Sequence, residues 1–185
     1  MRKKVFLLAV LILCFWQSKA TQILIHMDET QPNHLKAYGI AYWVLTYEVE
    51  VDWLLNYRGG SFMFDHNQKF AHELVIRGVG YQVISDAQAN NILSEIASPN
   101  SNMDAMKLEK HPKIAVYSPA SKQPWDDAVT LVLTYAEIPY DVIFDDEIMY
   151  NELPKYDWLH LHHEDFTGQY GKFYNSFGSM PWYKK

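Results

Sequence analysis

The chain has 185 residues, and its 22 acidic residues outnumber its 16 basic ones, which gives a net charge of −6 with histidine neutral. A negative surface repels phosphate backbones and anionic lipid, so the composition argues against a nucleic-acid-binding protein. The length fits a short leader followed by one ordinary globular domain.

Residues 1–20 have the order of a secretory signal peptide. Basic residues 2–4 precede an apolar run, Val5–Trp16, and the small residues Ser18 and Ala20 follow it. The run has 12 residues, whereas a membrane-spanning helix needs about 20, so we expect cleavage after Ala20 and no stable membrane anchor. The protein is therefore predicted to be exported, to the periplasm or beyond. The only cysteine, Cys14, lies in the leader, so the mature chain would have no thiol nucleophile and no disulfide.

Strand and helix patterns alternate along residues 21–185, which predicts an α/β domain with a mostly parallel sheet flanked by helices. In the first half, a turn at Arg58–Gly60 precedes a short returning edge strand, Ser61–Phe64, and Ser85 is a candidate N-cap. Residues 68–76 could be helical or extended. The other predicted elements are strands Gln22–Met27, Glu48–Leu55 and Tyr81–Ile84, and helices Asn33–Thr46 and Asp86–Ile96.

Residues 98–112 are irregular and form the one plausible internal domain boundary. Beyond them the strand and helix patterns become sharper. The acidic segment Asp145–Leu153 is interpreted as a connection between strands. The predicted elements are strands Lys113–Tyr117, Tyr140–Phe144 and Tyr156–His162 and the helix Trp125–Ala136.

Ligands of open parallel sheets bind outside the carboxyl ends of the strands, so polar residues at those ends are the candidates for a binding site. The first strand leads into Asp28, Glu29 and Thr30, for which a helix-capping role is the favoured alternative. Ser118 and Asp145 follow two later strands. Asp28, Glu29, Ser118 and Asp145 are therefore the candidate ligand-binding residues.

The last predicted strand ends in the densest polar cluster, and its members are the candidate catalytic residues: His160, His162, His163 and Glu164. His160 and His162 project from the same face of a strand, and imidazoles beside carboxylates suit zinc binding or acid–base catalysis. Packing of the histidines against neighbouring aromatic rings is the favoured alternative. We predict no cofactor, and a divalent metal on His160 and His162 is the other hypothesis.

Long strings of the sequence resemble a family of exported proteins from Gram-negative bacteria that is labelled asparagine synthetase B. The resemblance covers nearly all of the chain after the leader. It is carried by Asn33–Trp43 (NHLKAYGIAYW), Trp53–Phe62 (WLLNYRGGSF), Val83–Asn90 (VISDAQAN), Gln123–Val142 (QPWDDAVTLVLTYAEIPYDV) and Leu153–Tyr174 (LPKYDWLHLHHEDFTGQYGKFY).

Residues 113–162 also resemble the start of a class I glutamine-amidotransferase-like domain, which implies a flavodoxin-like sheet. Members of the family continue past the position of Lys185, so the resemblance implies the front part of a longer protein. The family label implies an N-terminal cysteine and an ATP pyrophosphatase loop. This chain has Arg2 in a signal peptide and no such loop, so we predict no asparagine synthetase activity.

Three functions remain open at the level of the sequence, and they leave undecided whether the chain is an enzyme. The first is an exported amidotransferase-like protein that binds a small polar ligand at the strand ends. The second is a hydrolase, metal-assisted or using histidine and carboxylate groups. The third is a cell-envelope assembly partner that uses the aromatic residues of segment 166–183 as an interface.

Overall fold

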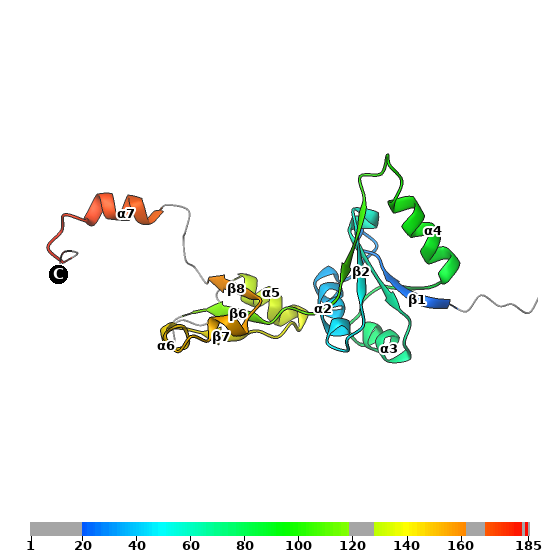
Figure 1. Cartoon of the computed structure of the whole chain (residues 1–185), viewed down its shortest axis with the longest axis horizontal. Helices are drawn as coiled ribbons and strands as arrows, with labels where there is room; N and C mark the ends of the chain where they lie inside the picture. The colour runs from blue at the N-terminus through cyan, green and yellow to red at the C-terminus, as the bar shows by residue number, and fades with distance from the viewer. Residues whose placement is uncertain (1–19, 119–127, 162–168, 183, 185) are drawn as a thin grey trace, which may run out of the picture. The chain divides into compact units, whose positions relative to one another are not determined.

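The computed structural model describes residues 20–118, 128–161, 169–182 and 184 (Figure 1). Within these ranges the chain is mixed α/β, with six α-helices and two sheets. It divides into two compact units. The first comprises residues 1–111 together with 135–138, and the second comprises residues 112–134 and 139–185. The predicted signal peptide lies almost wholly outside the described residues.

The first unit is built on a five-stranded sheet in which every hydrogen-bonded pair is antiparallel. The prediction of a mostly parallel sheet is wrong for this unit. The strands, in spatial order, are β4 (Gln82–Ser85), β1 (Ala20–Ile25), β3 (Ser61–Asp65), β2 (Val51–Leu55) and β5 (Asp104–Leu108).

The position of β3 explains the difference. Strands β1 and β2 run in the same direction, as a strand–helix–strand pattern predicts, but β3 lies between them and pairs antiparallel with both. The sequence predicted β3 as an edge strand. It is instead the central strand, and four of its five residues are buried. The edges of the sheet are β4 and β5. Strand β5 lies in the segment that was predicted to be irregular; four of its five side chains are exposed, so its sequence shows no apolar pattern.

Two helices, α2 (His34–Leu45) and α3 (Gln68–Ile76), cover one face of this sheet, and α4 (Asp86–Ile96) covers part of the other (Figure 1). Each helix begins at a side-chain cap, because the first backbone N–H groups of a helix have no partner inside it. Asn33 caps α2, Asn67 caps α3, and Ser85 with Gln88 forms a capping box on α4. The segment 68–76, left open by the sequence, is thus a helix.

Alternating side chains of the strands form two buried cores, one on each face of the sheet. The larger core joins the sheet to α2 and α3 and includes Ile23, Ile25, Val51, Phe62, Phe64, Ile40, Val44, Phe70 and Leu74. The smaller core joins it to α4 and includes Leu24, Leu54, Met63, Ile84, Ala89 and Ile96. Because successive strand residues face opposite sides, this alternation fixes the register of β1 and β3.

The second unit contains a three-stranded parallel sheet, as the sequence predicted for this part of the chain. Its order is β7 (Asp141–Ile143), β6 (Ile114–Tyr117) and β8 (Trp158–Leu161), with Ile114, Ala115 and Val116 buried in the centre. The helix α5 (Ala128–Ala136) connects β6 to β7 and ends in the segment that belongs to the first unit. The predicted acidic connection after β7 is a short helix, α6 (Asp145–Met149).

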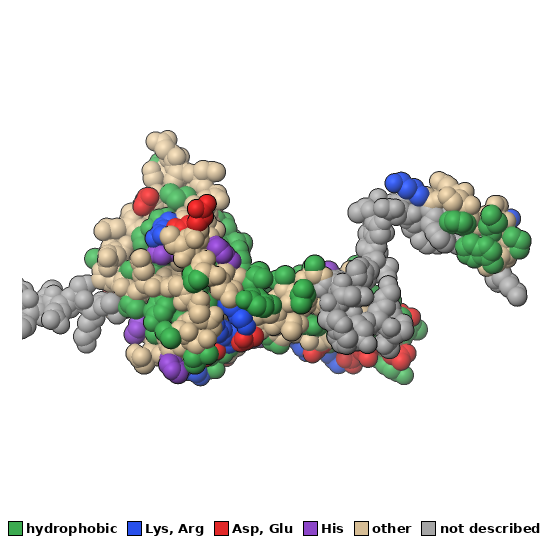
Figure 2. All heavy atoms as spheres, turned by 180° about the vertical axis from the view of Figure 1, so that it is seen from behind, with side chains coloured by type: hydrophobic (Ala, Val, Ile, Leu, Met, Phe, Trp, Pro, Cys, Tyr) green, Lys and Arg blue, Asp and Glu red, His purple; other side chains and the backbone are tan. Residues whose placement is uncertain are grey.

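The last helix among the described residues is the amphipathic α7 (Gln169–Phe177). Apolar side chains gather at this end of the chain in Figure 2, where Phe177, Met180 and Trp182 are exposed. This segment is where the sequence placed a possible interface. No helix within the described ranges is long and apolar enough to cross a membrane.

Candidate ligand-binding site

A connected group of polar side chains lies at the carboxyl end of β1. The buried imidazole of His26 accepts a hydrogen bond at Nε2 from Arg58 Nη1, at 2.7 Å. The same guanidinium donates from Nε to Asp28 Oδ2, at 2.6 Å. His26, Asp28 and Arg58 therefore form one chain of contacts from the buried end of β1 to the surface.

The backbone that carries Arg58 is held in an uncommon conformation. The turn between β2 and β3 contains the 3₁₀ segment η1 (Tyr57–Gly59), and both Asn56 and Arg58 have positive φ, at 61° and 44°. Each residue other than glycine that is held at positive φ destabilises the fold by about 1–3 kcal/mol, and such residues cluster at functional sites. The backbone N–H of Met27 donates to the Arg58 carbonyl at 3.1 Å, so the turn is fastened to the residue that follows His26.

The contact with Arg58 fixes the protonation of His26. A guanidinium has only donors, so Nε2 must be the acceptor and the neutral imidazole carries its proton on Nδ1. That Nδ1 atom is buried and has no hydrogen-bond partner among the described residues. Burial is the main cause that lowers the pKa of His26 below 6.5, and the charge of Arg58 adds to the shift. Hydrogen bonding with the Gln82 side chain and the charge of Asp28 oppose it, although no Gln82 atom is in hydrogen-bond geometry with Nδ1. The ring is therefore neutral at pH 7 and presents an unmatched N–H.

His26 also lines a small pocket of about 190 Å³. We call it the β1-end pocket, and the residues that line it are His26, Thr30, Gln31, Gly80, Tyr81 and Gln82. The pocket joins the end of β1 to the segment that enters β4, which lies about fifty residues further along the chain.

Gln31 holds the two walls of the β1-end pocket together. Its amide nitrogen donates to the carbonyl of His26 at 2.8 Å and to that of Gly80 at 3.0 Å. Its amide oxygen accepts from the N–H of Gly80 at 2.9 Å and from that of Asn33 at 3.4 Å. All four hydrogen-bonding positions of the Gln31 amide are therefore used within the protein. The residue is also buried.

The predicted residues Asp28 and Glu29 have different positions. Hydrogen bonds from Thr30 and from Arg58 lower the pKa of Asp28 to about 2. Asp28 therefore belongs to the site and stays ionised, and its contact with Thr30 forms a local turn. The helix-capping role favoured from the sequence for this corner is wrong, because Asn33 caps α2. Glu29 is exposed and makes no hydrogen bond or ion pair with any residue in the described ranges.

The lowered pKa values of His26 and Asp28 predict how the stability of the first unit changes at acidic pH. A histidine whose folded pKa is lowered stabilises the fold while neutral, so this contribution is complete above pH 6.5 and is lost as the pH falls below it. The carboxylate of Asp28 contributes above its unfolded pKa of 3.8, and that contribution is lost as the pH falls toward about 2.

The measurement is the urea midpoint at pH 7.5, 6 and 5 for the wild type and for His26→Gln. The difference between the two proteins should shrink as the pH falls, because the variant lacks the group that titrates. A difference that stays constant over this range would contradict the predicted linkage.

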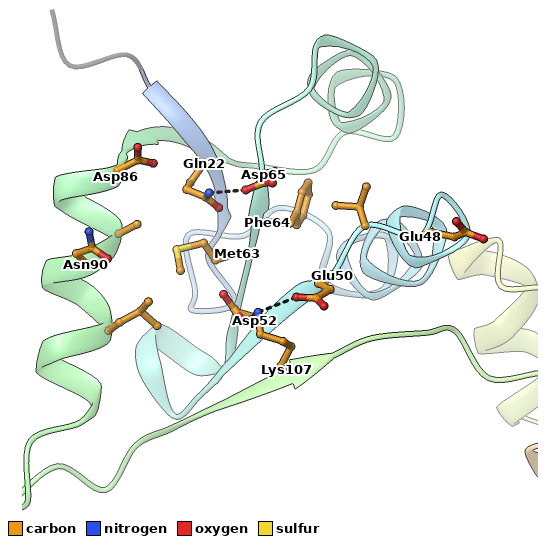
Figure 3. Close-up of a pocket in the computed structure, with 13 residues that line it drawn as sticks. Gln22, Glu48, Glu50, Asp52, Met63, Phe64, Asp65, Asp86, Asn90 and Lys107 are labelled. Atoms are coloured by element: carbon orange, nitrogen blue, oxygen red, sulfur yellow. Dashed lines mark hydrogen bonds and ion pairs between the residues drawn. The ribbon is translucent and has the colours of Figure 1, made fainter. Parts of the chain in front are cut away.

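A larger cleft, of about 700 Å³, lies on the face of the first unit's sheet that α4 partly covers, between α4 and strands β2 and β3 (Figure 3). Five carboxylates and one lysine line it: Glu48, Glu50, Asp52, Asp65, Asp86 and Lys107. Met63 of β3 and Leu93 of α4 add apolar side chains to its lining.

Most of these carboxylates already have partners within the protein. Lys107 Nζ lies 3.0 Å from Glu50 Oε2 and 3.3 Å from Asp52 Oδ1. Asp65 accepts from Gln22, and Asp86 accepts from Thr21. None of the buried unpaired polar atoms in the described part of the chain lines this cleft. The β1-end pocket, where such an atom is found, is therefore the better candidate for a ligand site.

In the second unit, the predicted residues Ser118 and Asp145 lie at the carboxyl ends of β6 and β7. The hydroxyl of Tyr117 donates to Asp145 Oδ1 at 2.8 Å, and the backbone of Ser118 continues the pairing by donating to the Ile143 carbonyl at 3.0 Å. Ser118 is buried, and its hydroxyl has no hydrogen-bond partner among the described residues. Ser118 and Asp145 are thus close together at the carboxyl ends of the parallel strands β6 and β7.

The predicted histidine cluster is described only in part. His160 is half-buried on β8 opposite Val116. His162, His163 and Glu164 lie outside the described residues, so the hydrolase and metal hypotheses stay predictions. In the ranges that are described, no group of three histidine, cysteine, aspartate or glutamate side chains is placed to hold a metal ion.

Sequence reasoning missed the residues that matter most at the β1-end pocket. Arg58 was interpreted only as part of a turn, and His26 only as part of a strand. One signal was present, because an arginine directly before two glycines and two residues after Asn56 is typical of a turn with positive φ. No local signal marks Gln31, whose partner Gly80 is distant in the sequence.

Comparisons of the chain with protein families, with curated proteins and with solved structures find no match.

Proposed function

We propose that this protein binds a small polar ligand at the carboxyl end of β1, in the β1-end pocket. The observation that carries the proposal is the buried N–H of His26, which has no hydrogen-bond partner among the described residues and belongs to a residue that lines a pocket. Leaving a buried donor unmatched costs about 1–3 kcal/mol, and a ligand oxygen would supply its partner. The strained turn and the contact with Asp28 hold Arg58, and therefore the imidazole, in one orientation.

The experiment is an NMR titration of the side-chain nitrogens of His26 with a panel of small sugars, amino acids, organic acids and amines. A saturable shift of the His26 signal with at least one compound is expected. The variant Gln82→Ala should weaken that binding, because Gln82 lines the pocket and is exposed. Gln68→Ala, which removes an exposed glutamine at the start of α3, is the matched control. If no compound moves the His26 signal, the proposal is wrong.

We further propose that the second unit is the start of a flavodoxin-like sheet of the class I glutamine-amidotransferase type. The proposal is supported by the strand order, because β7, β6 and β8 are the second, first and third strands of this unit. Flavodoxin-like sheets begin in that order, and their ligands bind where the order reverses. In this unit that point lies between β6 and β8, beside Ser118 and His160, which makes it a second position for a polar ligand.

The proposal includes export and excludes amidotransferase and asparagine synthetase activity for this chain. Its support is the order of charged, apolar and small residues in the leader and the position of Cys14 within it. Intact-mass measurement of the exported form should place its first residue at or near Thr21. A soluble protein that retains Met1 would contradict export.

A further inference from the structure

The lining of the β1-end pocket contains no charged side chain. Its residues are a neutral histidine, a threonine, two glutamines, a glycine and a tyrosine. The charged groups that contact lining residues are Arg58, at His26, and Asp28, at Thr30; they contact each other at 2.6 Å and so balance. An ionised ligand group entering this pocket would lose its hydration and meet no opposite charge, which is costly.

Several of the lining groups cannot contact a ligand because their hydrogen bonds are already used. The side chain of Gln31 and the backbone of Gly80 bind each other in both directions. What remains is the Nδ1 proton of His26, the amide of Gln82 and the hydroxyl of Tyr81. The Thr30 hydroxyl donates its proton to Asp28, so it can only accept from a ligand. These groups can donate to and accept from neutral oxygen atoms.

The size of the pocket limits the ligand further. A volume of 190 Å³ corresponds to roughly six water molecules at about 30 Å³ each, so the pocket suits a small compound that carries several oxygens. Tyr81 adds an aromatic side chain to the wall, and aromatic rings provide apolar contact area together with a polar end. Hydroxyl groups around a compact apolar ring match this combination.

We infer that the ligand of the β1-end pocket is an uncharged polyhydroxy compound of monosaccharide size, whose oxygen accepts a hydrogen bond from His26 Nδ1. This inference rests on the proposed function. Arg58 acts as a positioning residue, because its donation to Nε2 keeps the proton of His26 on Nδ1 and thereby makes the imidazole a donor.

The test compares matched compounds that differ in charge. The full chain, labelled with ¹⁵N in its histidines, is titrated with D-glucose and myo-inositol and then with D-glucuronate and D-glucosamine. We expect saturable shifts of the His26 nitrogens with at least one uncharged compound, and binding at least tenfold weaker for its charged counterparts. Gln82→Ala should weaken binding of the uncharged compound about threefold to tenfold, as the loss of one neutral hydrogen bond implies.

The role of Arg58 is tested with Arg58→Lys, which keeps the charge but loses the planar fork of donors. The ¹⁵N shifts of His26 should then report a mixture of the two neutral tautomers, and sugar affinity should fall at least threefold. Arg77→Lys is the matched control, because Arg77 pairs with Glu73 and Glu137 and contacts neither His26 nor Asp28. An unchanged tautomer in Arg58→Lys would overturn the positioning role.

The outcomes separate this inference from the proposed function. Saturable binding of glucuronate or glucosamine at His26, with no binding of the uncharged compounds, would overturn the ligand class and leave the pocket a binding site. Absence of any shift with the uncharged compounds also overturns the inference. Only the failure of the whole panel of sugars, acids, amino acids and amines overturns the proposed function itself.

Discussion

Replacing Gln31 with leucine is expected to lower the free energy of unfolding of the first unit by about 3 kcal/mol or more, because each buried polar group left without a partner costs about 1–3 kcal/mol. The change removes hydrogen bonds to the carbonyls of His26 and Gly80 and to the N–H groups of Gly80 and Asn33. Leucine has a similar volume but no polar atoms, so these four backbone groups stay in place and lose their partner.

The measurement is urea unfolding, monitored through hydrogen exchange of the β1 amides so that unfolding of the first unit is observed by itself. Gln22→Leu is the matched control, since Gln22 makes one exposed side-chain hydrogen bond, to Asp65. We expect that control to cost less than about 1 kcal/mol. Equal effects of the two substitutions would show that Gln31 does not join the end of β1 to the Gly80 segment.

Gly59→Ala is expected to destabilise the first unit by about 3 kcal/mol or more, because backbone strain and a steric clash add together. Gly59 has a φ of 83°, which side chains rarely adopt. A Cβ at this position would lie 2.5 Å from the carbonyl carbon of Met27 and 2.9 Å from the nitrogen of Asp28. Both of these are backbone atoms that cannot move without shifting the end of β1.

Gly78→Ala separates the two contributions. Gly78 also has a positive φ, of 67°, but a Cβ there meets nothing within 4 Å. Its replacement should therefore cost only the conformational strain, about 1–2 kcal/mol. The excess in Gly59→Ala measures how closely the Arg58 turn packs on β1, and the ¹⁵N shifts of His26 should change in that variant alone. If the two variants lose the same free energy of unfolding, the close approach of the Gly59 turn to Met27 and Asp28 does not contribute to stability.

These two substitutions act on opposite sides of the same site. Gln31 fixes the segment before β4 to the end of β1, and Gly59 lets the turn before β3 approach that end closely enough for Arg58 to reach His26. The pocket therefore depends on three segments that are far apart in the sequence. A change at any one of them should alter ligand binding even where the ligand itself is not touched.

Elements with a local signal were predicted well. Helix α4 begins at Asp86, directly after the N-cap Ser85, as expected, because an N-cap and its Gln88 partner are only three residues apart. Helix α2 and the parallel strands of the second unit also follow from apolar spacing within single segments. Asp28, Ser118 and Asp145 lie at strand ends, as their positions after apolar runs indicated.

The sequence by itself thus determined where most helices and strands form, since capping and apolar periodicity act between residues a few positions apart. Only the tertiary structure decided that β3 is inserted between β1 and β2, which makes the first sheet antiparallel. It also decided that His26 is buried against Arg58 and that Gln31 binds Gly80. These features depend on contacts across 32 and 49 residues, and such contacts form only when the whole unit packs, so no short stretch of sequence encodes them.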